Sequence, residues 1–269
     1  MSKTYVTLAS IWTWLVLGSC IALWLPLMSI IWLATWPFDR ERYWVGLFFR
    51  KIAVVTATLN PLWHFRVTGT MPENPRRPYV VVSNHESFTD ILLISHLPWE
   101  MKWLSKIELL RIPVLGWIMR IAGDIPVERG TRSSAAKAMR RCLEVLKGRM
   151  SIIIFPEGTR STTGELLPFK DGAFRLAIDA GVPILPLVVR GTSTALRKHD
   201  WRVGPSDAEV RVLTPVDTTG LGHKDIPALK ERVRNLIQET RRGMEGAAPP
   251  CSLQGWYSHA DDRGPVPLP

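Results

Sequence analysis

The 269-residue chain is short of cysteine and of acidic side chains, and both shortages narrow the class of protein. Its cysteines, Cys20, Cys142 and Cys251, lie far apart and show none of the short spacings of zinc or iron–sulfur sites, so we expect reduced thiols and no metal. The chain has 24 acidic residues and 34 Lys and Arg, which give a net charge of +10 and exclude an acidic protein. With 46% hydrophobic residues the chain can fill a core, which excludes a disordered linker. The basic charge suits anionic lipids, phosphorylated substrates or nucleic acid, and does not choose among them.

A long stretch near the N-terminus has no charge at all. Residues 4–38 contain no Asp, Glu, Lys, Arg or His, but five of the twelve tryptophans. One helix of this length would extend roughly 50 Å, beyond the ~30 Å hydrocarbon core of a bilayer, so we expect Pro26 to kink it or to divide it into two helices. The stretch is too long for the apolar part of a signal peptide, which predicts that it is retained. A single crossing and insertion into one leaflet both fit the sequence.

The following segment, residues 43–59, is mostly apolar around Arg50 and Lys51, which is typical of a helix in the head-group region of a membrane. A helix buried in the main domain is the alternative. We assign residues 1–60 to membrane-anchoring helices, 61–242 to the main domain and 243–269, rich in Pro and Gly, to a disordered tail. Basic residues outnumber acidic ones after the apolar stretch, which favours a cytoplasmic main domain, at the inner membrane if the source is bacterial.

Beyond residue 60, short β-branched runs alternate with helical patterns. The apolar run at 152–155 is typical of a strand covered on both faces, and the helical stretches between such runs allow crossover connections. The sequence therefore predicts an α/β fold, a layered αβα domain with a mixed sheet of roughly seven strands. The predicted strands are 65–69, 79–83, 102–105, 124–128, 151–155, 184–190 and 209–213, and the predicted helices are 90–97, 106–121, 132–147, 172–180 and 225–242.

A histidine and an aspartate follow the second predicted strand, in the segment NHESFTD (residues 84–90). The ends of strands are where α/β sheets place their sites. Two residues five apart on an ideal helix point away from each other, so His85 and Asp90 can meet only if the chain turns between them. Asp90 would then accept one ring N–H and fix the tautomer, leaving the other nitrogen of His85 free to take a proton. A purely structural pair, with Asp90 as a helix N-terminal carboxylate, is the alternative.

Two more strand ends bring cationic side chains. The segment GDIPVER (123–129) ends in Arg129. The segment FPEGTRS (155–161) contains Gly158, which permits a tight turn, and Arg160, a second planar guanidinium that can donate two hydrogen bonds. Its Glu157 could pair with an arginine. Two such arginines suggest an anionic ligand, although each could equally serve a salt bridge or lie on a solvated surface. A fourth segment, VPILP (182–186), has no titratable group and can only shape a strand or line an apolar groove.

These four segments, in this order and spacing, resemble the signature of the 1-acyl-sn-glycerol-3-phosphate acyltransferase family: N-H-x-x-x-x-D, G-x-x-x-x-x-R, F-P-E-G-T-R-S and V-P-I-x-P. The resemblance extends over residues 79–189, and its first and third segments are the specific ones. Pro126 departs from a regular strand in the second segment, so we expect an edge or bulged strand there.

The resemblance implies that the main domain is an acyltransferase in which His85 is the general base and Asp90 orients it. It further implies that phosphate and glycerol contacts come from the set Asn84, Lys106, Arg129, Glu157, Gly158, Thr159 and Arg160. The implied reaction transfers an acyl group from a coenzyme A or acyl carrier protein thioester to the sn-2 hydroxyl of lysophosphatidate, giving phosphatidate for phospholipid synthesis. No cofactor is implied besides the thioester co-substrate, and the implied partners are these substrates, membrane lipids and acyl carrier protein.

Other functions remain open on the sequence. Another lysophospholipid acceptor is an alternative, as is a non-catalytic, basic lipid-binding protein at the membrane surface. A serine hydrolase is a rival because residues 191–195 (GTSTA) approximate a nucleophile elbow around Ser193. Nucleic acid is disfavoured, because the basic pairs are scattered and match no nucleic-acid motif. No phosphate-binding or dinucleotide-binding glycine loop implies ATP or a nicotinamide.

Overall fold

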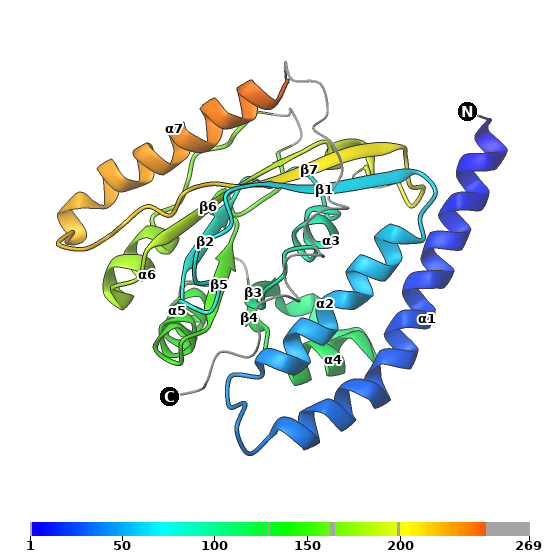
Figure 1. The fold of residues 1–269 in the computed structure, drawn as a ribbon, viewed down its shortest axis with the longest axis horizontal. Helices are drawn as coiled ribbons and strands as arrows, with labels where there is room; N and C mark the ends of the chain where they lie inside the picture. Colours follow the sequence, from blue (N-terminus) through cyan, green and yellow to red (C-terminus); the bar gives the residue numbers. More distant parts are fainter. Residues whose placement is uncertain (1, 129, 162–164, 198–199, 246–269) are drawn as a thin grey trace.

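A computed structural model describes residues 2–128, 130–161, 165–197 and 200–245 of the chain. Seven strands form one mixed sheet in the order β1-β7-β6-β2-β5-β3-β4, with helices on both of its faces (Figure 1). The strands are β1 Trp63–Gly69, β2 Val80–Ser83, β3 Met101–Lys106, β4 Ile125–Val127, β5 Ser151–Ile154, β6 Ile184–Arg190 and β7 Ser206–Val212. All seven lie where the sequence predicts strands, and the α/β class is confirmed.

The helices follow the predictions less evenly. The α-helices are α1 Lys3–Thr35, α2 Tyr43–Thr58, α3 Asp90–Ile94, α4 Leu115–Ala122, α5 Arg132–Lys147, α6 Gly172–Ala180 and α7 Ile226–Glu245. The single helix predicted over 106–121 is wrong: it is a 3-10 turn, Ile107–Arg111, followed by α4. Pro113 between them explains the break, because proline disfavours helical backbone in the residue before it. Helix α7 continues past the predicted end at 242, and the rest of the predicted tail, 246–269, lies outside the described residues.

Five neighbouring strands of the sheet run in one direction, and the two at one edge run in the opposite direction. Strands β2, β3, β4, β5 and β6 are mutually parallel, whereas β7 is antiparallel to β6 and β1 is parallel to β7. Every residue of β2 and β5 is buried, as the continuous apolar runs predict. Strand β4 forms the opposite edge with Pro126 exposed, which fits proline's inability to donate a ladder hydrogen bond. The carboxyl ends of five strands therefore meet at one edge.

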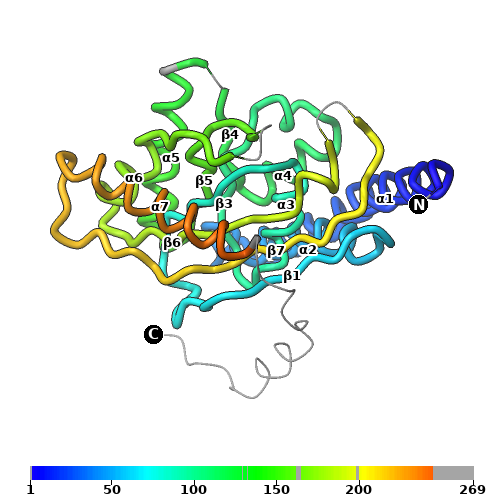
Figure 2. Tube along the Cα trace, turned by 90° about the horizontal axis from the view of Figure 1, so that it is seen from above, coloured from blue at the N-terminus to red at the C-terminus, as the bar shows by residue number. Residues whose placement is uncertain are grey.

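Successive side chains along each strand point to opposite faces of the sheet, so the core is divided between the two faces. Val80 and Val82 of β2 pack with α5, α6 and α7 on one face, and Val81 packs with α3 on the other. Helices α1, α2 and α4 share a further cluster around Met28, Val45 and Ile118. Helix α1 runs along one side of the domain in Figure 1, and in Figure 2, which views the molecule from above, its N-terminal part extends at the right beyond the other elements.

Helix α1 is one continuous helix with Pro26 inside it, so the predicted alternative of two separate helices is not observed. Its length and composition suffice to cross a membrane. It packs on the domain along much of its length: the indole N–H of Trp14 donates to the carbonyl of Trp201 at 2.7 Å, and that of Trp24 to the carbonyl of Phe48 at 3.1 Å. One face of α1 is thus fixed to the domain while the other remains exposed and apolar.

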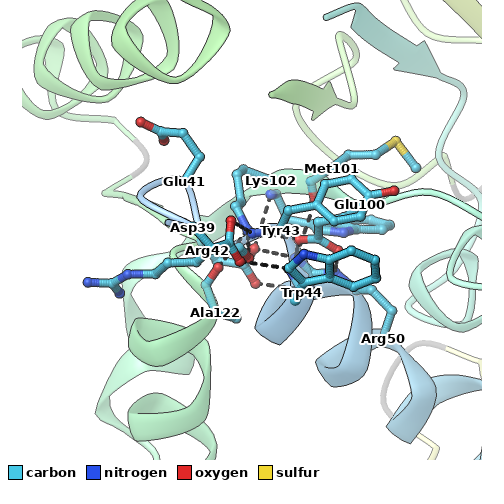
Figure 3. A network of polar contacts seen from close by, with 12 residues as sticks. Asp39, Glu41, Arg42, Tyr43, Trp44, Arg50, Glu100, Met101, Lys102 and Ala122 are labelled. Atoms are coloured by element: carbon cyan, nitrogen blue, oxygen red, sulfur yellow. Dashed lines mark hydrogen bonds and ion pairs between the residues drawn. The ribbon is translucent and has the colours of Figure 1, made fainter. Parts of the chain in front are cut away.

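Helix α2 is packed into the domain, which corrects the expectation that Arg50 faces lipid head groups. Arg50 is buried and donates to Asp124 at 3.0 Å and to Glu100 at 3.2 Å. Those carboxylates raise the pKa of Arg50 above its usual range although burial opposes the charge. Buried Lys102 donates to Glu100 at 3.1 Å, which completes a neutral cluster of two cations and two carboxylates (Figure 3). The cluster pins α2 to the start of β3 and the α4–β4 turn.

Candidate active site

The side chains that the sequence singles out gather after the carboxyl ends of the parallel strands. His85 follows β2, Lys106 ends β3, and residues 157–160 follow β5. Arg129, expected after β4, lies outside the described residues. Strand pairing brings these ends together because β2 lies beside β5 and β5 beside β3. The topology therefore assembles one site from segments that are far apart in the sequence.

His85 and Asp90 meet as predicted. Nδ1 of His85 lies 2.7 Å from Oδ2 of Asp90, and both residues are buried. The turn that the spacing requires is formed by residues 85–89, and Asp90 opens α3. Because Asp90 can only accept when ionised, His85 carries its proton on Nδ1 and leaves Nε2 as a proton acceptor. The contact is confirmed, and its catalytic use remains a prediction.

Asp90 is held by three further donors that fix its orientation. Its Oδ2 accepts the backbone N–H groups of Glu86 at 2.8 Å and of Ser87 at 3.0 Å. Its Oδ1 accepts the hydroxyl of Thr192, which follows β6. Four donors hold this buried carboxylate in one orientation, from which its charge can stabilise positive charge on the imidazole.

Phe155, the residue after β5, stacks on a face of the imidazole, whereas Asp90 contacts the edge of the ring. The two rings are stacked with centroids 4.0 Å apart and planes inclined by 16°. The ring of His85 is therefore held by an apolar face as well as by Asp90. The sequence offered a signal for Phe155, its place at a strand end, but the stacking depends on β2 and β5 being neighbours.

Glu157 and Asn84 bind the backbone. The two carboxylate oxygens of Glu157 accept the N–H groups of His85 at 2.8 Å and of Leu167 at 2.9 Å. The pairing with an arginine that the sequence allows is not formed within the described residues. The side-chain amide of Asn84 exchanges two hydrogen bonds of 2.8 Å with the backbone of Val189. Burial raises the pKa of Glu157 above its usual value, while its backbone donors oppose that rise. The geometry favours a positioning role for both side chains over direct contact with substrate.

The turn after β5 presents its cations more openly. Gly158 has φ of +72°, a conformation that favours glycine, and a Cβ there would lie 2.6 Å from Nζ of Lys170. Thr159 and Lys106 are exposed, and Arg160 is half-buried. Within the part of the chain that the structure describes, Arg160 and Lys106 form no ion pair. Lys170, which is not among the predicted site residues, thus joins Arg160 as a cation at this turn.

Helix α7 also reaches the site, which no local pattern in the sequence indicates. Nε of Arg241 donates to Oε1 of Glu86 at 3.1 Å, and Oε2 of Glu86 accepts the N–H of Gly191 at 3.2 Å. Burial, followed by the charge of Asp90, raises the pKa of Glu86. The Glu86 carboxylate therefore connects the turn of residues 85–89 to the start of the 3-10 turn Thr192–Thr194 and to helix α7.

An apolar cavity of about 250 Å³ lies beside Phe155. Leu104, Val127, Met139 and Ile154 line it, together with Glu128 after β4 and with Gly158 and Lys170 at the cationic turn. The cavity thus joins an apolar wall to a cationic turn next to the histidine pair. Within the described residues, no group of three or more His, Cys, Asp and Glu is placed to hold a metal ion.

The arrangement suits a histidine base better than a serine nucleophile. Ser193 lies exposed in a 3-10 turn, and the neighbouring Thr192 supplies the hydroxyl that reaches Asp90. Among the described residues, no hydrogen bond links Ser193 to His85, so the constellation of a nucleophile elbow is not formed. An oriented imidazole with a free Nε2 can take a proton from an alcohol that a neighbouring group positions.

The chain is similar to known acyltransferases. The family model described as Acyltransferase matches residues 64–190. The chloroplastic 1-acyl-sn-glycerol-3-phosphate acyltransferase BAT2 of Brassica napus is 34% identical over 210 residues, which cover 76% of this chain and 58% of that protein. The alpha form of the Homo sapiens enzyme is 40% identical over 173 residues, covering 64% and 61%. The chain thus spans about three fifths of the length of these relatives.

A solved structure extends the similarity to the fold. The crystal structure of the 1-acyl-sn-glycerophosphate (LPA) acyltransferase PlsC from Thermotoga maritima superposes with a TM-score of 0.78 at 27% sequence identity. The match covers 93% of this chain and all of that one.

Proposed function

Because the chain belongs to the 1-acyl-sn-glycerol-3-phosphate acyltransferase family, we propose that it transfers an acyl group from a thioester to the sn-2 hydroxyl of lysophosphatidate, giving phosphatidate. The observation that supports this most is the 2.7 Å contact between the buried His85 and Asp90 at the ends of the parallel strands. Phosphatidate formation would place the protein in phospholipid synthesis.

In the proposed reaction, Nε2 of His85 takes the proton of the acceptor hydroxyl as its oxygen attacks the thioester carbonyl. Asp90 stabilises the imidazolium that forms, and Phe155 keeps the ring in place. When the tetrahedral intermediate collapses, the C–S bond breaks and the imidazolium returns its proton to the departing thiolate. No covalent enzyme intermediate is needed, because the acyl group passes directly from sulfur to oxygen.

Acceptor and donor would bind on different parts of the site. The phosphomonoester of lysophosphatidate carries nearly two negative charges, which suits the cations Arg160, Lys170 and Lys106. Arg129 remains a proposed member of this group on the family's pattern. The apolar cavity beside Phe155 suits an acyl chain. The thioester carrier is coenzyme A or acyl carrier protein, and both belong in the assay.

The decisive assay combines the purified protein with labelled acyl-coenzyme A or acyl carrier protein and a panel of lysophospholipids, and scores both lipid product and free thiol. The expected result is phosphatidate from lysophosphatidate and the acyl thioester, with no lipid product from the other lysophospholipids. Product from other lysophospholipids would assign a different acceptor, and thiol release without lipid product would indicate a thioesterase.

Substitution of the base gives a second test. His85→Ala should lower turnover by about 10²- to 10⁴-fold, the range for loss of a general base, without loss of the fold. His64→Ala is the matched control, because His64 is exposed on β1 and makes no side-chain hydrogen bond within the described residues. Near-normal turnover in His85→Ala would remove His85 from the role of base.

The protein is membrane-associated through α1, and we propose that α1 lies within one leaflet. Leu8, Leu15, Leu23 and Ile30, each at least 60% exposed, recur at intervals of seven or eight residues and form an apolar stripe. Contacts on the opposite face at Trp14 and Trp24 hold α1 to the domain, so a crossing would draw the domain into hydrocarbon. Cysteines placed at Ser2 and Phe38 should both react with an impermeant thiol reagent from the same side of sealed vesicles. Reaction from opposite sides would instead show a crossing.

A further inference from the structure

A basic cavity lies on the membrane-anchoring side of the domain, apart from the His85 site. It has a volume of about 300 Å³ and is formed by the α1–α2 turn, α4, the α4–β4 turn and α5. Buried Lys102 lies at its base, where its ammonium donates to Glu100 and to the carbonyls of Arg42 and Ala122 at 2.8–3.1 Å (Figure 3). The charge of Lys102 is therefore already balanced.

The walls carry an excess of positive charge. Arg40, Arg42, Arg120 and Arg141 line the cavity. Two carboxylates also line it: Asp124, which belongs to the neutral buried cluster, and Glu41, which does not. Arg42 donates to the carbonyls of Arg120 and Ile121, and no carboxylate among the described residues forms an ion pair with it. Arg141 pairs with Glu144 at 3.0 Å and lies 3.9 Å from Glu41.

Two of these arginines are free to bind an anion. Arg40 and Arg120 are both exposed, and neither forms an ion pair with any residue in the described parts of the chain. They come from segments 80 positions apart, and the fold places them on one cavity. A guanidinium presents a planar fork that matches the oxygens of a phosphate.

Exposed aromatic side chains flank these arginines and point to the source of the anion. Trp36 and Phe38, just before Arg40, are 60% and 71% exposed, and Trp117, one turn before Arg120, is 53% exposed. Aromatic rings beside basic side chains are typical of protein surfaces that sit at the boundary between lipid tails and head groups. A soluble anion would give no reason for the exposed rings.

We propose that this cavity binds the phosphate of an anionic bilayer lipid, with Arg40 and Arg120 as its principal contacts. The site is separate from acyl transfer, since none of its lining residues belongs to the His85 site. It gives the protein a preference for anionic membranes in addition to the apolar attachment through α1.

The test compares binding of the purified full chain to vesicles of phosphatidylcholine alone and to vesicles of phosphatidylcholine and phosphatidylglycerol in about equal parts, measured by flotation. Arg40→Gln/Arg120→Gln should weaken binding to the anionic vesicles on the order of tenfold, since each basic side chain near such a surface strengthens binding severalfold. Binding to phosphatidylcholine alone should not change, because α1 is intact.

The matched control is Arg175→Gln/Arg232→Gln, which removes the same charge from exposed positions on α6 and α7. It should bind both kinds of vesicle like the unmodified protein. An equal loss in both double variants would show an effect of net charge alone, and no loss in either would show no site; each result overturns the proposal. Release by inorganic phosphate beyond that caused by sodium chloride of equal ionic strength would assign a soluble anion and overturn the lipid assignment.

Acyl transfer and lipid binding can fail independently in these experiments. His85→Ala should retain the preference for anionic vesicles even when turnover is lost. If the unmodified protein lacked acyltransferase activity, the flotation result would still decide the proposal.

Discussion

Replacement of Asp90 by Asn isolates the charge of the carboxylate from its shape. Oδ2 of Asp90 accepts from His85 and from the backbone N–H groups of Glu86 and Ser87. Those backbone groups cannot accept a hydrogen bond, so the oxygen of the asparagine amide must occupy the Oδ2 position. Its NH₂ group then faces Thr192, whose hydroxyl can turn to accept. The variant therefore keeps the tautomer of His85 and loses only the charge.

The size of the effect follows from the distance between the charges. With Nδ1 and Oδ2 2.7 Å apart, the centres of the imidazolium and the carboxylate lie farther apart than these atoms. Charges about 4 Å apart at an effective dielectric constant of about 20 attract by roughly 4 kcal/mol. At about 1.4 kcal/mol per tenfold change in rate, the loss of this attraction lowers kcat by about 10³-fold.

The assay is the initial rate of thiol release from acyl-coenzyme A at saturating lysophosphatidate, with thermal unfolding as a check on the fold. Thr192→Val is the control, because it removes one neutral donor from Oδ1 and should lower kcat by no more than about tenfold. A folded Asp90→Asn variant within about tenfold of normal kcat would refute the electrostatic role of Asp90. Equal losses in the two variants would refute the assignment of the effect to charge.

Three further outcomes follow from buried groups. Gly46→Ala should destabilise the fold by about 1–3 kcal/mol in denaturant titrations, because the new Cβ would lie 2.3 Å from Oε1 of Glu100 in the buried ion cluster; an unchanged midpoint would contradict this packing. Arg241→Met should raise the pKa of buried Glu86 further. A carboxyl whose pKa is raised by folding stabilises the fold below its unfolded pKa, and this stabilisation is lost as pH rises through the folded pKa. The free energy of unfolding of the variant should therefore fall relative to that of the parent as pH increases. A difference that does not change with pH would argue against the ion pair between Arg241 and Glu86. Burial raises the pKa of Cys142 to about 12, so its thiol should resist alkylation near neutral pH until the protein unfolds. Rapid labelling of the native protein, measured by mass spectrometry, would show that reagents reach the core beneath helix α5 and would contradict this prediction.

Local patterns predicted much of this fold because the information for a strand or a helix lies within it. Continuous apolar runs placed β2, β5 and β6, and the exposed Pro126 marks β4 as the edge strand that proline requires. The spacing of His85 and Asp90 limited them to a contact across a turn, which the structure contains. Helix boundaries were less certain where a proline intervened, as at Pro113 and Pro26.

The sequence by itself determined the elements, the basic charge, the apolar N-terminal helix and the strand ends at which chemistry could occur. The partners of those residues were decided by the order of the strands and the packing of the helices, because residues distant in sequence can pair only once the sheet has brought them together. Thr192 reaches Asp90 from 102 positions away, Arg241 reaches Glu86 from 155, and Arg50 turns inward because Glu100 and Asp124 lie beneath α2. Such contacts have no periodicity or turn signature, so no local pattern contains them.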